Sequence, residues 1–316
     1  MQTVSARPTA RPWYYRVTNA RELEFYLAIS PWLIGFILFT GGPILAALVI
    51  SFTEWQVVDQ PKWVGLGNYI HMISSDRLFW AATFNTFYYV VFSVPLGVTV
   101  SVALAVLLNQ KVRGVAIFRT IYYLPSVTSG VAMSILWVWL FNPDVGLINS
   151  ALHLVGITGP EWLNSESWSK PALVLMSLLT AGGNMIVLLA GLQGIPEQLY
   201  EAAKLDGANG WQEFLHVTLP MLSPVVFFVV VISTIGAFQI FTQVFIISNG
   251  TGGPGTSTLV YVLYLYENGF SYLKMGYATA IAEILFLITL GLTIGQFAIG
   301  RRWVHYEASG RAGDTP

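Results

Sequence analysis

Long apolar segments separated by short polar ones dominate this chain. Each segment has roughly 22 to 30 residues, and at about 1.5 Å per residue even the shortest helix would cross a hydrocarbon core of about 30 Å. The pattern therefore predicts an all-α, polytopic membrane helix bundle with about six transmembrane helices. The predicted spans are Leu27–Ile50, Asn85–Leu108, Thr120–Phe141, Pro171–Leu192, Leu219–Ser248 and Met275–Ile299.

Composition supports a membrane protein over a pair of soluble domains. Of the 316 residues, 55% are hydrophobic and 10% are charged, whereas soluble domains carry about 25% charged residues. The stretch from Phe214 to Tyr266 contains no Asp, Glu, Lys or Arg. Three prolines, Pro43, Pro95 and Pro125, fall inside predicted spans and should kink them,.

Charge places the loops and excludes several kinds of chemistry. Eleven of the fifteen Lys and Arg lie in the tails and alternate loops of one side, so the positive-inside rule puts both termini in the cytoplasm,. Residues 1–26 and 301–316 then form cytoplasmic tails, and the first span is an uncleaved anchor. Net charge −1 indicates no nucleic-acid partner, the absence of Cys excludes thiol chemistry, and four scattered His predict no metal site,.

The loop after the fourth span, around residues 194–224, fits the charge rule least, since it carries one Lys and four acids. Pro196 suits the start of a short helix, Gly207 suits a left-handed reversal, and Trp211 and Phe214 share a face of a second helix,. The loop therefore predicts a helix–turn–helix outside the bilayer. From these residues alone, it is either a docking surface or an ordinary interfacial linker.

The motif that separates these alternatives is EAAKLDGANGWQEFLHVTLPMLSP, from Glu201 to Pro224. It resembles the EAA loop of ABC importer permeases. The segments SFTEW from Ser51, FRTIYYLPSV from Phe118 and SNGTGGPGTST from Ser248 are similar to the MalF-like branch of sugar permeases. The resemblance implies a type I ABC importer permease with a transmembrane domain at residues 27–300 and a cytoplasmic coupling loop at residues 194–220.

The resemblance also implies a division of labour among subunits. A second permease subunit, two copies of a cytoplasmic ATPase and an extracytoplasmic sugar-binding protein are the expected partners, in the cell inner membrane. ATP and Mg would be used by the ATPase, since this chain has no GxxxxGK[ST] string and no expected cofactor or catalytic residue,. The residues expected to couple to the ATPase are Glu201, Ala202, Ala203, Asp206, Gly207 and Ala208.

Polar residues inside the spans are candidates for substrate contact. Asn184, Ser233, Gln239 and Gln243 would bind sugar hydroxyls or hydrogen-bond between helices, and Gln239 and Gln243 should share one helix face,. Stacking partners for a sugar ring would be Trp137, Phe238 or Phe241. No Lys or Arg falls inside a predicted span, which favours an uncharged, hydroxyl-rich substrate,.

Glu283 is the only acid inside a predicted span. An intramembrane carboxylate is a functional candidate, and its alternative is a structural carboxyl at a subunit interface. The leading function is import of di- or oligosaccharides. The alternatives are a glycerol-3-phosphate importer of the same family and an ion-coupled secondary transporter that uses Glu283. An intramembrane enzyme is not expected, because no paired acids, metal cluster or activated nucleophile is present.

Overall fold

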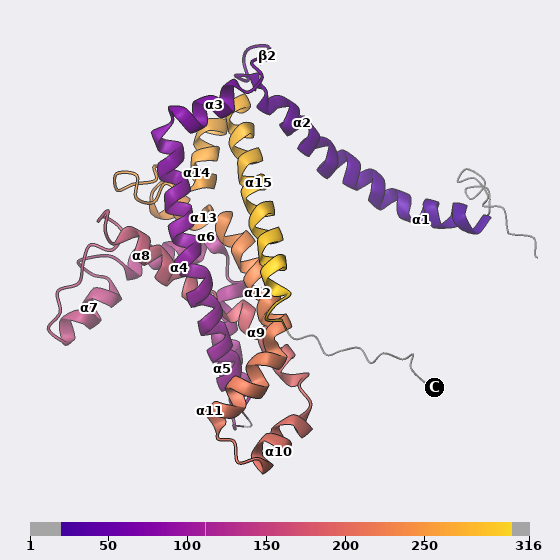
Figure 1. Cartoon of the computed structure of the whole chain (residues 1–316). Coiled ribbons are helices and arrows are strands. Elements are labelled where there is room, and N and C mark those ends of the chain that lie inside the picture. Colours follow the sequence, from indigo (N-terminus) through magenta and orange to yellow (C-terminus); the bar gives the residue numbers. More distant parts are fainter. Residues whose placement is uncertain (1–19, 111, 305–316) are drawn as a thin grey trace, which may run out of the picture.

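The computed structural model describes residues 20–110 and 112–304, and most of them are helical (Figure 1). The elements of the first half are α1 (Ala20–Phe36), the π-helical turn η2 (Ile37–Gly41), α2 (Gly42–Ser51), β1 (Thr53–Glu54), β2 (Lys62–Trp63), α3 (Gly67–Ser74), α4 (Arg77–Leu108), α5 (Val115–Val127), α6 (Gly130–Leu140) and α7 (Leu147–Leu154).

The second half is also helical. Its elements are α8 (Ser169–Leu179), α9 (Gly182–Gln193), α10 (Glu197–Leu205), α11 (Gly210–Glu213), η3 (Phe214–Thr218), α12 (Leu219–Phe238), α13 (Thr242–Ile247), α14 (Tyr261–Tyr266), η4 (Glu267–Ser271) and α15 (Met275–Gly300). The strands β1 and β2 pair antiparallel as a minimal hairpin, with Thr53 opposite Trp63.

The predicted number of spans agrees with the described residues, but the third, fourth and fifth predicted spans are not single helices. Four helical stretches are long and apolar enough to cross a membrane, and two bent pairs bring the number to six. The pair α5 and α6 bends by 101°, and the pair α8 and α9 bends by 44°. The third span breaks at Thr128 and Ser129, whose ψ angles of 144° and 130° are not helical, whereas Pro125 is accommodated inside α5.

The second span begins at Arg77, ahead of the predicted start at Asn85, because an N-cap fixes it there. One oxygen of the Asp76 carboxylate accepts hydrogen bonds from the backbone N–H groups of Leu78 (2.9 Å) and Phe79 (3.0 Å),. Its other oxygen accepts from the hydroxyls of Tyr264 and Tyr277. Asp76 thereby ties the start of α4 to α14 and α15 at the end of the bundle that carries α3.

The first span leaves the bundle from that same end (Figure 1). The helical stretch Leu23–Ser51 has no buried residue in its most apolar window, and Pro43 lies in the first turn of α2. Part of the predicted tail 1–26 is therefore helical, since α1 begins at Ala20. Residues 1–19 and 305–316, which hold most of both predicted tails, lie outside the described residues.

Two buried clusters stack along the rest of the bundle. One joins Met72 and Phe141 with residues of α14 and α15, and the other joins Met185 and Leu222 with residues of α4. Leu285 of α15 packs against both clusters. The break between α12 and α13 lies where the clusters meet, and this break positions the site described next.

Candidate transport pathway and coupling loop

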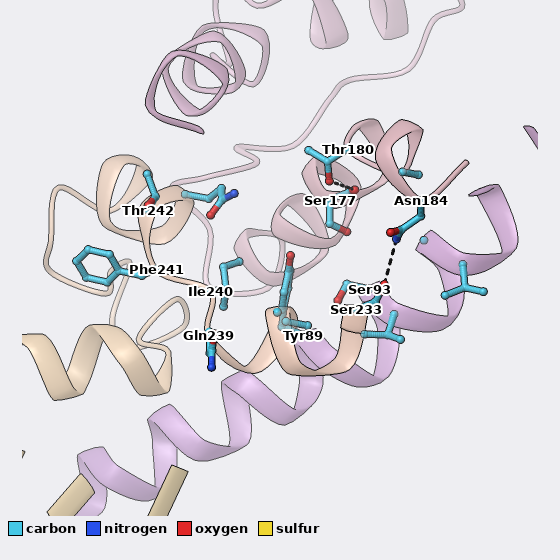
Figure 2. A pocket seen from close by; sticks show the side chains of 17 residues that line it. Tyr89, Ser93, Ser177, Thr180, Asn184, Ser233, Gln239, Ile240, Phe241 and Thr242 are labelled. Carbon is cyan, nitrogen blue, oxygen red and sulfur yellow. Dashed lines mark hydrogen bonds between the residues drawn. The ribbon is translucent and has the colours of Figure 1, made fainter. Parts of the chain in front are cut away.

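A cavity of about 310 Å³ lies where two interrupted spans meet the continuous helix α4 (Figure 2). The helix α4 contributes one wall, the junction of α8 and α9 a second, and the junction of α12 and α13 a third. Its polar lining residues are Tyr89, Ser93, Ser177, Thr180, Asn184, Ser233, Gln239, Thr242 and Gln243.

The helix breaks expose backbone groups that lipid cannot satisfy, so they must face protein or a polar cavity. At the junction of α8 and α9, the hydroxyl of Ser101 donates to the carbonyl of Ala181 at 2.9 Å. Within the same wall, the Thr180 hydroxyl donates to the Ser177 carbonyl at 2.8 Å. These bonds stabilise an interrupted span and leave side-chain hydroxyls at the cavity.

Four of the five predicted pathway residues come together at this cavity. The Asn184 amide donates to the Ser233 hydroxyl at 3.0 Å, and Gln239 and Gln243 line the same space (Figure 2). The predicted shared helix face is wrong, because α12 ends before Gln239 and α13 begins after it. Glu283, on α15, does not line the cavity.

Sequence reasoning missed the α4 and α8 walls. Tyr89 and Ser93 lie one turn apart on α4, and Ser177 faces them from α8. Ser93 is 6% exposed, and its hydroxyl has no hydrogen-bond partner among the described residues. The signal in the sequence was the spacing of four between two polar residues in an apolar span, which places both on one face.

The predicted stacking residues separate into three positions. Phe241 lines the cavity, and Trp137 lines a smaller hollow beside it that shares Gln243. Phe238 is 2% exposed and packs edge-on against Phe87, with ring centroids 5.2 Å apart. Phe238 is therefore a core residue, and the Phe241 ring packs against Phe245 and Tyr266, with ring centroids 5.3 and 5.2 Å away.

The predicted helix–turn–helix is present at the opposite end of the bundle from α3 (Figure 1). The helix α10 ends in a reversal in which Gly207 has φ +80°. The backbone N–H of Gly207 donates to the carbonyl of Lys204 (3.0 Å). The backbone N–H of Ala208 donates to the carbonyl of Ala203 (2.9 Å). These two bonds form a Schellman motif, which satisfies the last carbonyls of α10 and fixes the turn.

The second helix starts with a reciprocal cap. The Asn209 side chain accepts a hydrogen bond from the backbone N–H of Gln212 at 3.0 Å. In return, the Gln212 side chain accepts a hydrogen bond from the backbone N–H of Asn209 at 2.8 Å,. Trp211 and Phe214 stack with centroids 5.5 Å apart, as their spacing predicted. Pro196 was predicted at the first helical position, but it is the N-cap of α10, whose first helical residue is Glu197.

Five of the six predicted coupling residues line a shallow hollow of about 520 Å³ on this loop. Four are Ala202, Ala203, Gly207 and Ala208, and the fifth is the adjoining acid Asp206. Glu201 lies beside them on α10 and is exposed. Small residues around a hollow let a partner's side chain approach the backbone closely, and the exposed acids add negative charge to its edge.

One basic residue is closer to the pathway than the sequence indicated. Lys170 lies in the first turn of α8, and its ammonium donates to the Asn85 side-chain oxygen of α4 at 3.0 Å. Lys170 lies one residue before the predicted span Pro171–Leu192, but α8 begins at Ser169 and so includes this cation. No cluster of three or more His, Asp or Glu that would hold a metal occurs in residues 20–110 and 112–304.

Comparisons with known proteins agree with this architecture. Residues 93–305 match the family of binding-protein-dependent transport system inner membrane components. The chain is 43% identical over 289 residues to the probable ABC transporter permease protein YesP of Bacillus subtilis, covering 91% of this chain and 93% of that protein. It is 37% identical over 295 residues to the lactose transport system permease protein LacF of Rhizobium radiobacter, covering 90% and 98%.

A solved structure shows the same fold. A chain of a bacterial ABC transporter involved in the import of the acidic polysaccharide alginate superposes with a TM-score of 0.79 at 25% identity, covering 92% of this chain and 98% of that one. The protein belongs to the family of ABC importer permeases and is a multi-pass inner-membrane protein. As a member of that family, it is a transport component rather than an enzyme.

Proposed function

We propose that this chain forms half of the translocation pathway of an ATP-driven, binding-protein-dependent importer of di- or oligosaccharides. The observation that carries the proposal is the cavity at the interrupted spans, whose walls present hydroxyls, amides and two aromatic rings, Tyr89 and Phe241. These groups match the chemistry of a sugar, which has many hydroxyls and an apolar ring face. The lactose permease of Rhizobium radiobacter is a relative whose name supports a saccharide as substrate.

The cavity offers both donors and acceptors to a sugar. The free hydroxyl of Ser93 supplies one of each, and the Gln239 and Gln243 amides supply more,. Asn184 and Ser233 already bond each other, so a sugar would have to compete for that bond. Phe241 lines the cavity but already packs against Phe245 and Tyr266, so a sugar would have to compete for its ring. A second permease subunit would close the open side of the pathway.

The coupling loop would lie in the cytoplasm and dock on one of two ATPase copies, which bind ATP and Mg. Leu205 at its tip is 89% exposed and Trp211 is 67% exposed, and large apolar side chains this exposed mark contact surfaces. The rigid turn at Gly207 would transmit ATPase closure to α9 and α12 as a rigid-body motion, with both termini cytoplasmic.

An ion-coupled transporter is the less favoured function. It would need a titrating group in the pathway, and Glu283 lies on α15 outside the cavity. A glycerol-3-phosphate importer of the same family would need a cation beside the substrate, and no Lys or Arg is among the residues that line the cavity.

The test is sugar uptake into proteoliposomes that contain this chain, its companion permease, the ATPase and the binding protein. We expect uptake to require ATP and the ATPase subunit. Uptake by this chain alone, driven by a proton gradient, would refute the proposal. Glu201→Lys should impair assembly with the ATPase while membrane insertion is preserved, whereas Glu213→Lys, on the second helix, is the matched control.

A further inference from the structure

The Lys170 ammonium occupies a built position rather than a flexible surface. Asn85 accepts a hydrogen bond from it at 3.0 Å, and the Phe84 and Tyr88 rings lie 5.4 and 5.6 Å from it. Ring faces attract a cation at this distance. The ammonium is thus held by one amide and two aromatic rings, all on α4.

Asn85 is itself fixed and cannot turn away. It is 5% exposed, and its amide nitrogen donates to the carbonyls of Thr256 (2.7 Å) and Leu259 (3.0 Å). Those two bonds determine which side of the amide faces α8, so the oxygen always points at Lys170. The position of the ammonium therefore depends on three separate segments of the fold.

This cation has no anionic partner within the part of the chain that the structure describes. All its described contacts are neutral: the Asn85 oxygen and the two rings. A half-buried ammonium without a carboxylate keeps part of its desolvation cost uncompensated. An anion that reaches this position would gain a charge-assisted hydrogen bond, because an ammonium carries three donors and the Asn85 oxygen accepts from one.

The contact between α4 and α8 that holds Lys170 continues along both helices to the pathway cavity. On α8, Lys170 and Ser177 are seven residues apart, and on α4, Asn85 and Ser93 are eight apart, so each pair lies on one helix face about 11 to 12 Å apart,. Ser177 and Ser93 line the cavity. Lys170 therefore lies on the same face of α8 as the cavity-lining Ser177, but closer than Ser177 to the end of the bundle that carries α3.

Phe84 adds an aromatic surface to the same position, since it is 65% exposed. A cation next to an exposed ring suits a sugar that carries a carboxylate: the ring stacks on the apolar sugar face, and the ammonium pairs with the acid. We propose that Lys170 binds the carboxylate of an acidic saccharide on its way to the cavity, so that the substrate class includes uronate-containing oligosaccharides. This inference rests on the proposed function as a sugar permease.

The experiment uses the complete importer in proteoliposomes. Uptake is measured for an oligogalacturonate and for the galactose oligomer of the same linkage and length. The variants are Lys170→Gln, which keeps a donor for Asn85 but loses the charge, and Lys170→Arg, which keeps the charge. Lys62→Gln removes a positive charge from the exposed strand β2 as a matched control. Each result is divided by wild-type uptake of the same sugar, so the selectivity of the shared binding protein cancels.

Lys170→Gln should lower uptake of the acidic sugar about tenfold or more and leave the neutral sugar within about twofold, as expected for the loss of one charge-assisted bond. Lys170→Arg and Lys62→Gln should retain uptake of both. An equal loss for both sugars, or none, overturns the inference. A defect with both sugars that tracks the anionic-lipid content of the vesicles assigns Lys170 to a lipid phosphate and also overturns it. A wild-type importer that moves the galactose oligomer but not the oligogalacturonate overturns the inference while the proposed function stands. A wild-type importer that moves no saccharide with ATP contradicts the proposed function itself.

Discussion

The coupling loop and the pathway cavity are built by opposite means. The shape of the loop is determined by local hydrogen bonds: a Schellman turn and a reciprocal cap, all within residues 203–212. The cavity is assembled from three spans, and its polar contacts join residues such as Asn184 and Ser233, which are 49 positions apart. A sequence motif can therefore specify the loop, whereas the cavity depends on how interrupted helices pack.

This difference shows where function tolerates change. Under the proposed function, the loop would dock on a partner whose surface is fixed, so its backbone geometry would have to be kept. The cavity would bind a substrate with many similar hydroxyls, so single contacts could change while its overall chemistry is kept. Substitutions in the loop should accordingly abolish coupling, and those in the cavity should adjust affinity.

The largest effect is expected from Gly207→Pro. Proline fixes φ near −65°, whereas Gly207 has φ +80°, and the change also removes the N–H that bonds to Lys204,. A cost of about 3 kcal/mol or more corresponds to roughly a hundredfold loss of the coupled state. ATP-driven uptake and ATPase co-purification should both fall. Gly210→Pro is the control, because the first helical position of α11 tolerates proline,.

A smaller effect is expected at the junction of α8 and α9. A Cβ at Gly182 would collide with the backbone carbonyl of Tyr122 on α5, so Gly182→Ala should destabilise the bundle by about 1 to 3 kcal/mol,. A lower unfolding temperature in detergent would report it. In the adjacent control Gly183→Ala, the new Cβ would lie 3.4 Å from that of Ser126 and should be tolerated. Equal effects of the two changes would contradict the close approach.

The substitution Ser93→Ala tests whether a single hydroxyl in the cavity contacts the substrate. The hydroxyl has no hydrogen-bond partner among residues 20–110 and 112–304, so its removal should leave the unfolding temperature nearly unchanged. Loss of one neutral hydrogen bond to the sugar should raise KM for uptake about two- to tenfold. Thr83→Val removes another α4 hydroxyl, one that bonds to the carbonyl of Phe79 and does not line the cavity. If both variants shift KM alike, Ser93 does not contact substrate.

The smallest effect concerns Asp76, outside the spans. Burial raises the pKa of its carboxyl, but hydrogen bonds from Tyr264, Tyr277 and the N–H groups of Phe79 and Leu78 outweigh burial, so the net pKa is lowered. The ionised form is thus stabilised in the native state, and this stability is lost as pH falls through the lowered pKa. The unfolding temperature should drop at pH values below about 4. Asp76→Asn, which keeps a cap, should reduce that drop.

The sequence by itself determined the features that depend on local patterns. Long apolar segments predicted six spans because each helix must bury its own backbone in lipid. The turn at Gly207 and the stacked pair of Trp211 and Phe214 followed from residue types and spacing, since both form within one or two helical turns. The motif from Glu201 to Pro224 identified the family that the comparisons then showed.

Only the tertiary structure decided which polar residues meet. It separated Gln239 from Gln243 by a helix break and brought both to one cavity with Tyr89 and Ser93. It also placed Lys170 against α4, although its position at the start of a span had indicated a solvated loop. A helix break or a pairing between distant spans depends on the neighbouring helices that satisfy freed backbone groups, and no local pattern in the sequence records those neighbours.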